Sequence, residues 1–171
     1  MTGRQHRVVI ALGSNVGDRL EHLQGGLDAL FDSPGLEFVT ASPVFETRPV
    51  GGPEQGDYYN AVLIARTLLP AHAVWERLRN VEASLGRERG QRWGPRTLDL
   101  DLIAYGDEVS EDPELTLPHP RAHERAFVLA PWREADPAAV IPGRGPVSEL
   151  LAAAGQDGVR RLDGAVLHPP A

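Results

Sequence analysis

Six hydrophobic segments, in the order strand, helix, strand, strand, helix, strand, limit the possible folds of this chain more than any other feature. Four segments have strand patterns, and they are Arg7–Leu12, Leu36–Glu46, Tyr58–Thr67 and Thr97–Tyr105. Apolar residues recur with helical spacing from Asp18 to Ser33 and from Pro70 to Gly86. This order matches the split βαβ, or ferredoxin-like, arrangement. We therefore predict an α+β fold with a largely antiparallel sheet and helices on one face.

Local signals refine the boundaries of these elements. Asp18 suits the N-cap of the first helix, and the adjacent glycines at 25 and 26 weaken that helix. Pro43 interrupts the second extended segment, as expected for an edge or bulged strand. Pro70 is expected in the first turn of the second helix, with Gly86 as its C-cap. Two further helices are predicted around Phe127–Glu134 and Val147–Ala154, within a single domain that spans residues 1–171.

Two carboxylates share one face of the last predicted strand. Strand side chains alternate between faces, so Asp99 and Asp101 point one way and Leu98, Leu100 and Leu102 the other. Their Cα atoms should lie roughly 6.5–7 Å apart. The carboxylates could therefore bind one divalent ion or a pair of ions, although a solvated strand face would also explain them.

Arginine is concentrated immediately before these aspartates. From Arg77 to Arg96 there are six arginines against two glutamates, a local charge of +4 in a chain of net charge −7. Guanidinium groups bind phosphate oxygens, whereas Mg²⁺ prefers oxygen ligands. A polyphosphate bound through Mg²⁺ would use both features. The rigid turn formed by Gly94 and Pro95 also distinguishes this segment from an ordinary solvated strand.

Composition excludes several kinds of chemistry. The chain has no cysteine, so it has neither disulfides nor thiolate metal sites, and a cytoplasmic location is expected. All 17 basic residues are arginine, which excludes a Schiff-base lysine and a Walker-type phosphate lysine. The acidic balance argues against a nucleic-acid partner, and no apolar run approaches the roughly 20 residues needed to cross a membrane.

Other candidate residues have both ordinary and functional interpretations. The segment from Gly13 to Gly17 is predicted to be a turn, because it lacks the glycine pattern of a phosphate loop. His119, between Pro118 and Pro120, could be a fixed donor to an anion or a turn residue without a role. Tyr58 and Asn60 could bind a flat heterocycle or simply pack within a strand.

The motifs together resemble the 6-hydroxymethyl-7,8-dihydropterin pyrophosphokinase family of the folate pathway. The resemblance rests on several ordered blocks: IALGSNVGD at residue 10, FETRPVG at 45, DYYNAV at 57, EASLGRERG at 82, RWGPRTLDLDLIAYG at 92 and LPHP at 117. It implies a ferredoxin-like α+β fold. It also implies transfer of pyrophosphate from ATP to the hydroxymethyl group of the pterin, with release of AMP.

The resemblance also implies residue roles. Asp99 and Asp101 would bind two Mg²⁺ ions on the ATP phosphates, and Arg87 and Arg96 would join them in catalysis. The implied ATP-binding residues are Glu82, Arg87, Arg89, Arg92, Trp93, Arg96, His119 and Arg125. The implied pterin-binding residues are Gly13, Ser14, Asn15, Thr47, Pro49, Val50, Tyr58, Asn60, Trp93 and Phe127. The segment that carries Arg87 and Arg89 could close over ATP and exclude water.

Four positions depart from the family pattern. Arg48 replaces a frequent Pro, Arg79 a usual Gln, Pro120 an aromatic or polar residue, and Glu114 a basic residue of some relatives. No residue is clearly assigned as a general base. Two alternatives to the pyrophosphokinase remain, a two-metal phosphohydrolase and a non-catalytic module that binds nucleotide or pterin. We expect a monomer whose partners are its two small-molecule substrates, ATP and the pterin.

Overall fold

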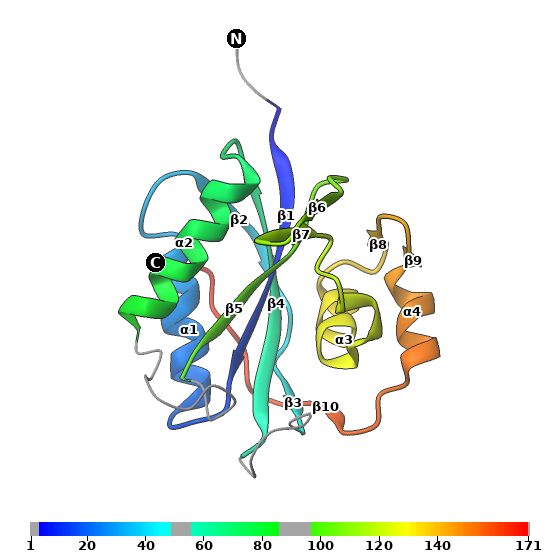
Figure 1. Ribbon diagram of the computed structural model, residues 1–171. Coiled ribbons are helices and arrows are strands. Elements are labelled where there is room, and N and C mark those ends of the chain that lie inside the picture. Colours follow the sequence, from blue (N-terminus) through cyan, green and yellow to red (C-terminus); the bar gives the residue numbers. More distant parts are fainter. Residues whose placement is uncertain (1–3, 49–55, 86–96, 171) are drawn as a thin grey trace.

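The computed structural model describes residues 4–48, 56–85 and 97–170 of the chain. Its central feature is a six-stranded sheet in which β10, β3, β4, β1 and β5 are neighbours in that order and β2 also pairs with β4. All of these pairings are antiparallel. Helices cover both faces of the sheet (Figure 1). The strands are β1 (His6–Ser14), β2 (Leu36–Ala41), β3 (Phe45–Thr47), β4 (Tyr58–Thr67), β5 (Asp99–Tyr105) and β10 (Val159–Arg161).

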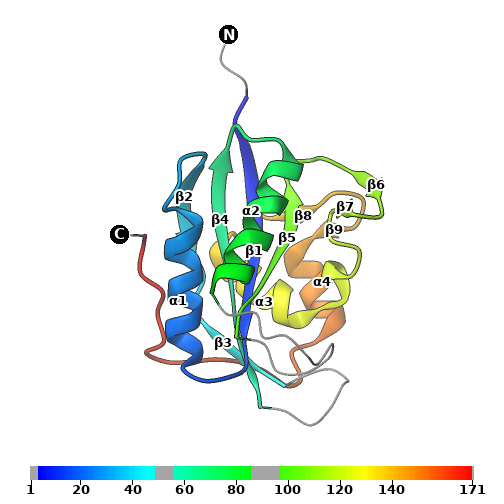
Figure 2. The same cartoon turned by 60° about the vertical axis from the view of Figure 1, so that its left-hand side comes forward.

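The predicted α+β fold with an antiparallel sheet is confirmed. Helices α1 (Arg19–Leu30) and α2 (Ala71–Ser84) connect the strands as expected and lie side by side on one face (Figure 2). Helices α3 (Ala126–Ala135) and α4 (Val147–Ala154) follow near the predicted positions. They pack on the opposite face, a placement that periodicity alone did not predict.

Several predicted boundaries are wrong. Gly13 and Ser14 continue β1 instead of forming a turn, because they pair with Asn60 and Tyr59 of β4. The first helix ends at Leu30 rather than Ser33. Pro70 is the N-cap of α2 rather than part of its first turn, and Leu85 is its C-cap. The predicted C-cap, Gly86, lies outside the described residues.

Some short elements were not predicted at all. They are the hairpin of β6 (Ser110–Asp112) and β7 (Leu115–Leu117), the hairpin of β8 (Val140–Ile141) and β9 (Gly145–Pro146), the 3₁₀ turn η1 (Ala122–Glu124), and β10. Strands of two or three residues are too short for alternation to show. Pro43, by contrast, marks the predicted interruption, since it falls between β2 and β3.

Strand alternation divides the core into two hydrophobic clusters. Val8, Ile10 and Leu12 of β1 pack with α1 and α2, whereas Val9 packs with α3 and α4. Leu98, Leu100 and Leu102 also belong to the α1–α2 cluster. Thus the residues between these leucines face the α3 layer. In the described part of the chain, no helix is both long and apolar enough to cross a bilayer.

Helix α1 packs closely against Leu98, the residue before β5, at Gly26. Its first turn is capped as predicted, because the Asp18 side chain accepts a hydrogen bond from the Glu21 N–H at 3.1 Å. A Cβ atom at Gly26 would lie 2.9 Å from a methyl group of Leu98, which is 1% exposed. A Cβ at Gly25 would meet nothing within 4 Å. Glycine at position 26 is therefore required by the contact with Leu98, whereas no contact requires glycine at position 25.

We predict opposite stability changes for Gly25→Ala and Gly26→Ala. Gly25→Ala should stabilise the protein by about 0.5–1 kcal/mol, because alanine favours the helix and open space receives its methyl group. Gly26→Ala should destabilise it by about 1–3 kcal/mol, because Leu98 must move within a packed core. Urea unfolding measures both changes. A Gly26→Ala variant as stable as Gly25→Ala would contradict this account of the helix–sheet contact.

Candidate active site

Asp99 and Asp101 share the sheet face that looks toward α3. Both side chains are half-buried, and Leu100 between them is completely buried on the other face. The predicted alternation along this strand is therefore present. Strand β1 pairs with this segment and sets Gly13 opposite Asp99 and Ala11 opposite Asp101. The residues of β1 opposite the two aspartates are therefore small, a glycine and an alanine.

A β-bulge in β5 positions His119 near this face. The pairing with β1 skips Ile103, since Val9 lies opposite Ala104 and Ile10 lies opposite Leu102. A bulged residue leaves backbone groups unused by the ladder. The Ile103 carbonyl accepts a hydrogen bond from the His119 N–H at 2.8 Å. The bulge thereby anchors the irregular segment after β7 to the strand that carries the aspartates.

The surroundings of the His119 imidazole favour its neutral form. Burial lowers its pKa; Asp101 opposes this effect, and the charges of Arg125 and Arg121 add to it. The backbone N–H of Arg121 donates to Nδ1 of His119 at 3.3 Å. Since Nδ1 is then an acceptor, the hydrogen of the neutral ring is on Nε2. His119 can therefore donate a hydrogen bond to an anion from Nε2.

Arg125 lies between the two groups of predicted site residues. It precedes α3 as its N-cap residue. Burial and the nearby Arg121 lower its pKa, whereas Asp101 and Glu124 raise it. The guanidinium carbon also lies 5.5 Å from the centre of the Phe127 ring. Arg125 is thus within electrostatic reach of the carboxylate face and beside a predicted pterin-binding aromatic residue.

The predicted pterin-binding residues of β3 and β4 lie together on the same sheet face. Thr47 and Asn60 are 3% and 8% exposed, and the Asn60 amide donates to Thr47 Oγ1 at 2.5 Å. Gly13 of β1 lies beside two side chains of β4. A Cβ there would come within 2.9 Å of Asn60 Oδ1 and 3.5 Å of the Tyr58 ring. Only glycine accommodates this packing without a shift.

Two other predicted pocket residues have different surroundings. The Ser14 hydroxyl lies 3.3 Å from Nδ1 of His22 in α1, so its side chain is on the α1 face of the sheet. The Asn15 amide donates to the Gly56 carbonyl at 3.3 Å. Asn15 thus holds the chain that leads into β4. The structure does not bring the Ser14 side chain together with Gly13, Tyr58 and Asn60.

Glu82 contacts the backbone of β5 from α2. It is 4% exposed, and its Oε2 accepts a hydrogen bond from the Leu100 N–H at 2.7 Å. Arg79 donates to the Leu100 carbonyl and lies 3.3 Å from Glu82 Oε1. Strand β5 is an edge strand, so no further strand pairs with the backbone groups on its outer side. Arg79 and Glu82 make hydrogen bonds with these groups at Leu100 instead. They fix the residue between Asp99 and Asp101.

Sequence reasoning missed this role of Arg79. The sequence shows that Arg79 departs from the usual Gln, but it does not show which residue Arg79 contacts. The i, i+3 spacing to Glu82 was the available signal, since such residues are neighbours on a helix surface. No pattern in the sequence indicates that both side chains reach the backbone of one residue of β5.

The remaining predicted site residues lie outside the described residues. They are Pro49, Val50, Arg87, Arg89, Arg92, Trp93 and Arg96. The described chain resumes at Gly56, immediately before β4, and at Thr97, immediately before β5.

The acidic pair fits a magnesium ion that is also bound by a nucleotide. Residues 4–48, 56–85 and 97–170 contain no cluster of three or more His, Asp or Glu side chains arranged to hold a metal. Mg²⁺ is usually held by one or two carboxylates together with substrate phosphates and water. Two half-buried carboxylates on one face supply that set of oxygen ligands.

The sequence is similar to one characterised family throughout the part that forms this site. The family model of 7,8-dihydro-6-hydroxymethylpterin-pyrophosphokinase matches residues 9–137. The 2-amino-4-hydroxy-6-hydroxymethyldihydropteridine pyrophosphokinase of Mycobacterium tuberculosis strain H37Rv is 47% identical over 159 residues, which cover 85% of this chain and 82% of that protein. The Pseudomonas aeruginosa protein of the same name is 38% identical, with 93% and 98% covered.

Solved structures with similar folds include wild-type Plasmodium falciparum HPPK-DHPS with pteroate. The TM-score is 0.69 and the sequence identity is 9%. The superposed region covers 90% of this chain and 45% of that one. The structure of the same protein with STZ-DHP has a TM-score of 0.69 at 12% identity, and the superposed region covers 88% of this chain and 43% of that one. This chain therefore spans less than half of those longer chains. At such low identity, these likenesses show the fold alone.

We predict that Glu82→Ala destabilises the protein more than Arg79→Gln. Glu82→Ala should cost about 1.5–3 kcal/mol, because it leaves the Leu100 N–H without its buried, charged acceptor. Arg79→Gln should cost about 1 kcal/mol, because an amide can still donate to the Leu100 carbonyl. Thermal and urea unfolding compare the two. Equal losses would contradict a shared contact with β5.

Proposed function

Because this chain belongs to the 7,8-dihydro-6-hydroxymethylpterin-pyrophosphokinase family, whose members are ATP-dependent pyrophosphokinases of folate biosynthesis, we propose the following reaction. The chain transfers pyrophosphate from ATP to the hydroxymethyl group of 6-hydroxymethyl-7,8-dihydropterin and releases AMP. One observation supports this most strongly. Gly13 pairs with Asn60 on one side and with Asp99 on the other, so the two substrate-binding groups adjoin on one sheet face.

The carboxylates form the phosphate half of the proposed site. Asp99 and Asp101 supply oxygen ligands for the magnesium of MgATP, and we propose two ions. When bound, Mg²⁺ neutralises phosphate charge and lowers the pKa of a coordinated hydroxyl. His119 donates from Nε2 to a phosphate oxygen, and Arg125 adds a positive charge beside it. These donors stabilise the negative charge on the transferring group.

The pterin half uses the buried polar groups of β3 and β4. Asn60 has one amide hydrogen bonded to Thr47, and its other polar positions can pair with the heterocycle. Tyr58 and Phe127 supply aromatic surfaces for the pterin ring. A site built to hydrogen-bond a polar ring discriminates strongly against analogues that lack the matching groups. Thr47 and Asn60 thereby contribute to substrate selection.

The residues outside the described ranges complete the proposal. Arg87 and Arg96 act on the transferring phosphates, and Arg89, Arg92 and Trp93 contribute to ATP binding. Trp93 joins Pro49 and Val50 in the pterin pocket. Of the described residues, Gly13 and Asn15 also contribute to it, and Ser14, whose side chain faces α1, contributes through its backbone. We further propose that residues 1–171 form a single pyrophosphokinase domain that acts as a cytoplasmic monomer.

We predict that Asp99→Asn and Asp101→Asn each lower pterin-dependent AMP formation by about 100-fold or more, because each removes a charged oxygen ligand. The assay contains ATP, Mg²⁺ and 6-hydroxymethyl-7,8-dihydropterin, and the nucleotides are separated chromatographically. Asp107→Asn is the control, because Asp107 is exposed beyond the end of β5 and should retain full activity.

The same assay separates the alternatives. Release of phosphate or nucleotide without pterin would support a phosphohydrolase. Binding of nucleotide or pterin without turnover would support a non-catalytic module. If the wild type forms AMP and Asp99→Asn retains near-normal activity, the assignment of the magnesium ligands is wrong.

A further inference from the structure

The C-terminal strand is attached to the strand that carries Thr47. Strand β10 pairs with β3, with Val159 opposite Thr47 and Arg160 opposite Glu46. The family match ends at residue 137, so this strand lies beyond it. The Leu162 N–H donates to the Val44 carbonyl at 3.0 Å, beyond the other end of the pairing. The C-terminal segment therefore holds β3 along its whole length.

The contact continues past Thr47 to the last described residue before position 49. The Arg48 N–H donates to the Gly158 carbonyl at 3.1 Å, and the Arg48 guanidinium lies 3.2 Å from Asp157 Oδ1. Proline has no N–H, so a chain with Pro at position 48 could not make this backbone bond. The hydrogen bond to Gly158 therefore explains why position 48 is occupied by Arg instead of the Pro that is frequent in the family.

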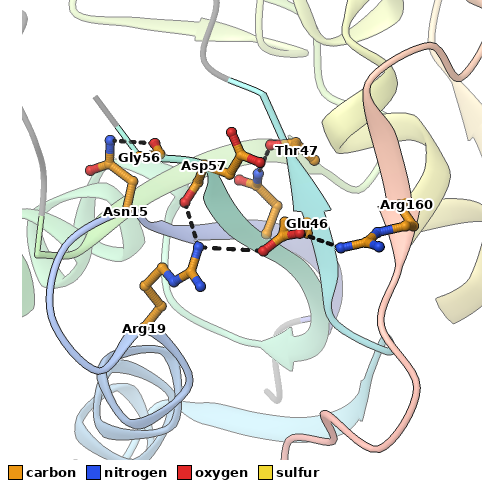
Figure 3. A network of polar contacts seen from close by, with 8 residues as sticks. Asn15, Arg19, Glu46, Thr47, Gly56, Asp57 and Arg160 are labelled. Carbon is orange, nitrogen blue, oxygen red and sulfur yellow. Dashed lines mark hydrogen bonds and ion pairs between the residues drawn. The ribbon is translucent and has the colours of Figure 1, made fainter. Parts of the chain in front are cut away.

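Glu46 is the charged centre of this region (Figure 3). Its side chain is 20% exposed and lies between two arginines, with Arg160 of β10 on one side and Arg19 of α1 on the other. Arg19 Nη1 lies 3.5 Å from Glu46 Oε2. One carboxylate therefore connects the C-terminal strand with the first helix across the edge of the sheet.

Arg19 extends these contacts to the beginning of β4. The same Nη1 donates to the Asp57 carbonyl at 2.8 Å (Figure 3), and the guanidinium carbon lies 3.8 Å from the centre of the Tyr59 ring. Asp57 immediately precedes Tyr58. Arg19 therefore fixes the backbone from which the first residues of β4 project.

Strand alternation places these contacts directly behind the proposed pterin site. Glu46 and Tyr59 face α1, whereas Thr47, Tyr58 and Asn60 face α3. A change in the position of Glu46 must move the adjoining Thr47, because the two share a strand backbone. The hydrogen bond between Asn60 and Thr47 depends on the relative position of the same two strands.

We propose that Glu46 is a positioning residue for the pterin-binding half of the site, and that Arg160 of the C-terminal strand acts through it. This inference rests on the proposed function, because it assigns Thr47, Tyr58 and Asn60 to pterin binding. The carboxylate does not touch substrate. It sets the separation and tilt of β3 and β4 from the opposite face, through Arg19 and Arg160.

Steady-state kinetics with each substrate varied in turn tests this role. Glu46→Gln should raise the KM for the pterin about 3- to 10-fold, because it weakens two ion pairs. The KM for ATP and kcat should stay within about twofold of wild type. Arg160→Gln should raise the pterin KM about 2- to 3-fold, since its side chain is 72% exposed and solvent screens the pair.

Arg161→Gln is the matched control. Arg161 is the next residue of the same strand, and its pair with Glu134 of α3 does not involve Glu46. We expect no change in the pterin KM for this variant. The double variant E46Q/R160Q should match Glu46→Gln alone, because both residues act through one contact.

The outcomes separate the two levels of the proposal. Absence of pterin-dependent AMP formation by the wild type would overturn the proposed function and this inference with it. With an active wild type, an unchanged pterin KM in Glu46→Gln would overturn only the positioning role. Equal increases in the KM for ATP and for the pterin would do the same, as would equal effects of Arg160→Gln and Arg161→Gln.

Discussion

The pairing of β1 with its two neighbours is the constraint on which the proposed site depends. Gly13 lies opposite Asn60 of β4 and opposite Asp99 of β5. Neighbouring strands are separated by about 4.8 Å, so this register places the pterin-binding and phosphate-binding strands about 10 Å apart, with only β1 between them. A slip of one residue would turn the side chains of a whole strand to the opposite face. Both groups therefore depend on the same register, which the leucines and valines of the two cores stabilise.

The structure supports the two halves of the site by different means. Arg79 and Glu82 hold β5 through the backbone of Leu100, between the two aspartates. Glu46, Arg19 and Arg160 hold β3 and β4 from the face opposite Thr47 and Asn60. In each case charged side chains fix a strand whose other face presents site residues. Substituting a supporting residue should therefore change the geometry of one half while the chemical groups of both halves remain.

Much of this arrangement could be predicted from local sequence. The order of strands and helices predicts the sheet, and the alternation from Leu98 to Leu102 predicts the shared face of the aspartates. The sequence could not place His119, because its position depends on the bulge at Ile103 and on a hydrogen bond to that carbonyl. It also gave no sign of β10, since three residues show no periodicity and their pairing with β3 spans more than a hundred residues. The sequence also did not show that the Ser14 side chain faces α1, because β1 continues two residues beyond its predicted end at Leu12.

In the proposed site, the magnesium and the nucleotide phosphates bind on the α3 face beside Asp99 and Asp101. Paramagnetic line broadening by Mn²⁺, bound together with a non-hydrolysable ATP analogue, measures the location of the metal most directly. We predict the strongest broadening at the amides of Ala11, Gly13 and His119, with loss of the effect in Asp101→Asn. The strongest broadening at the N-terminus of α1, around the surface groove of about 390 Å³ between Arg19 and Asp163, would contradict it.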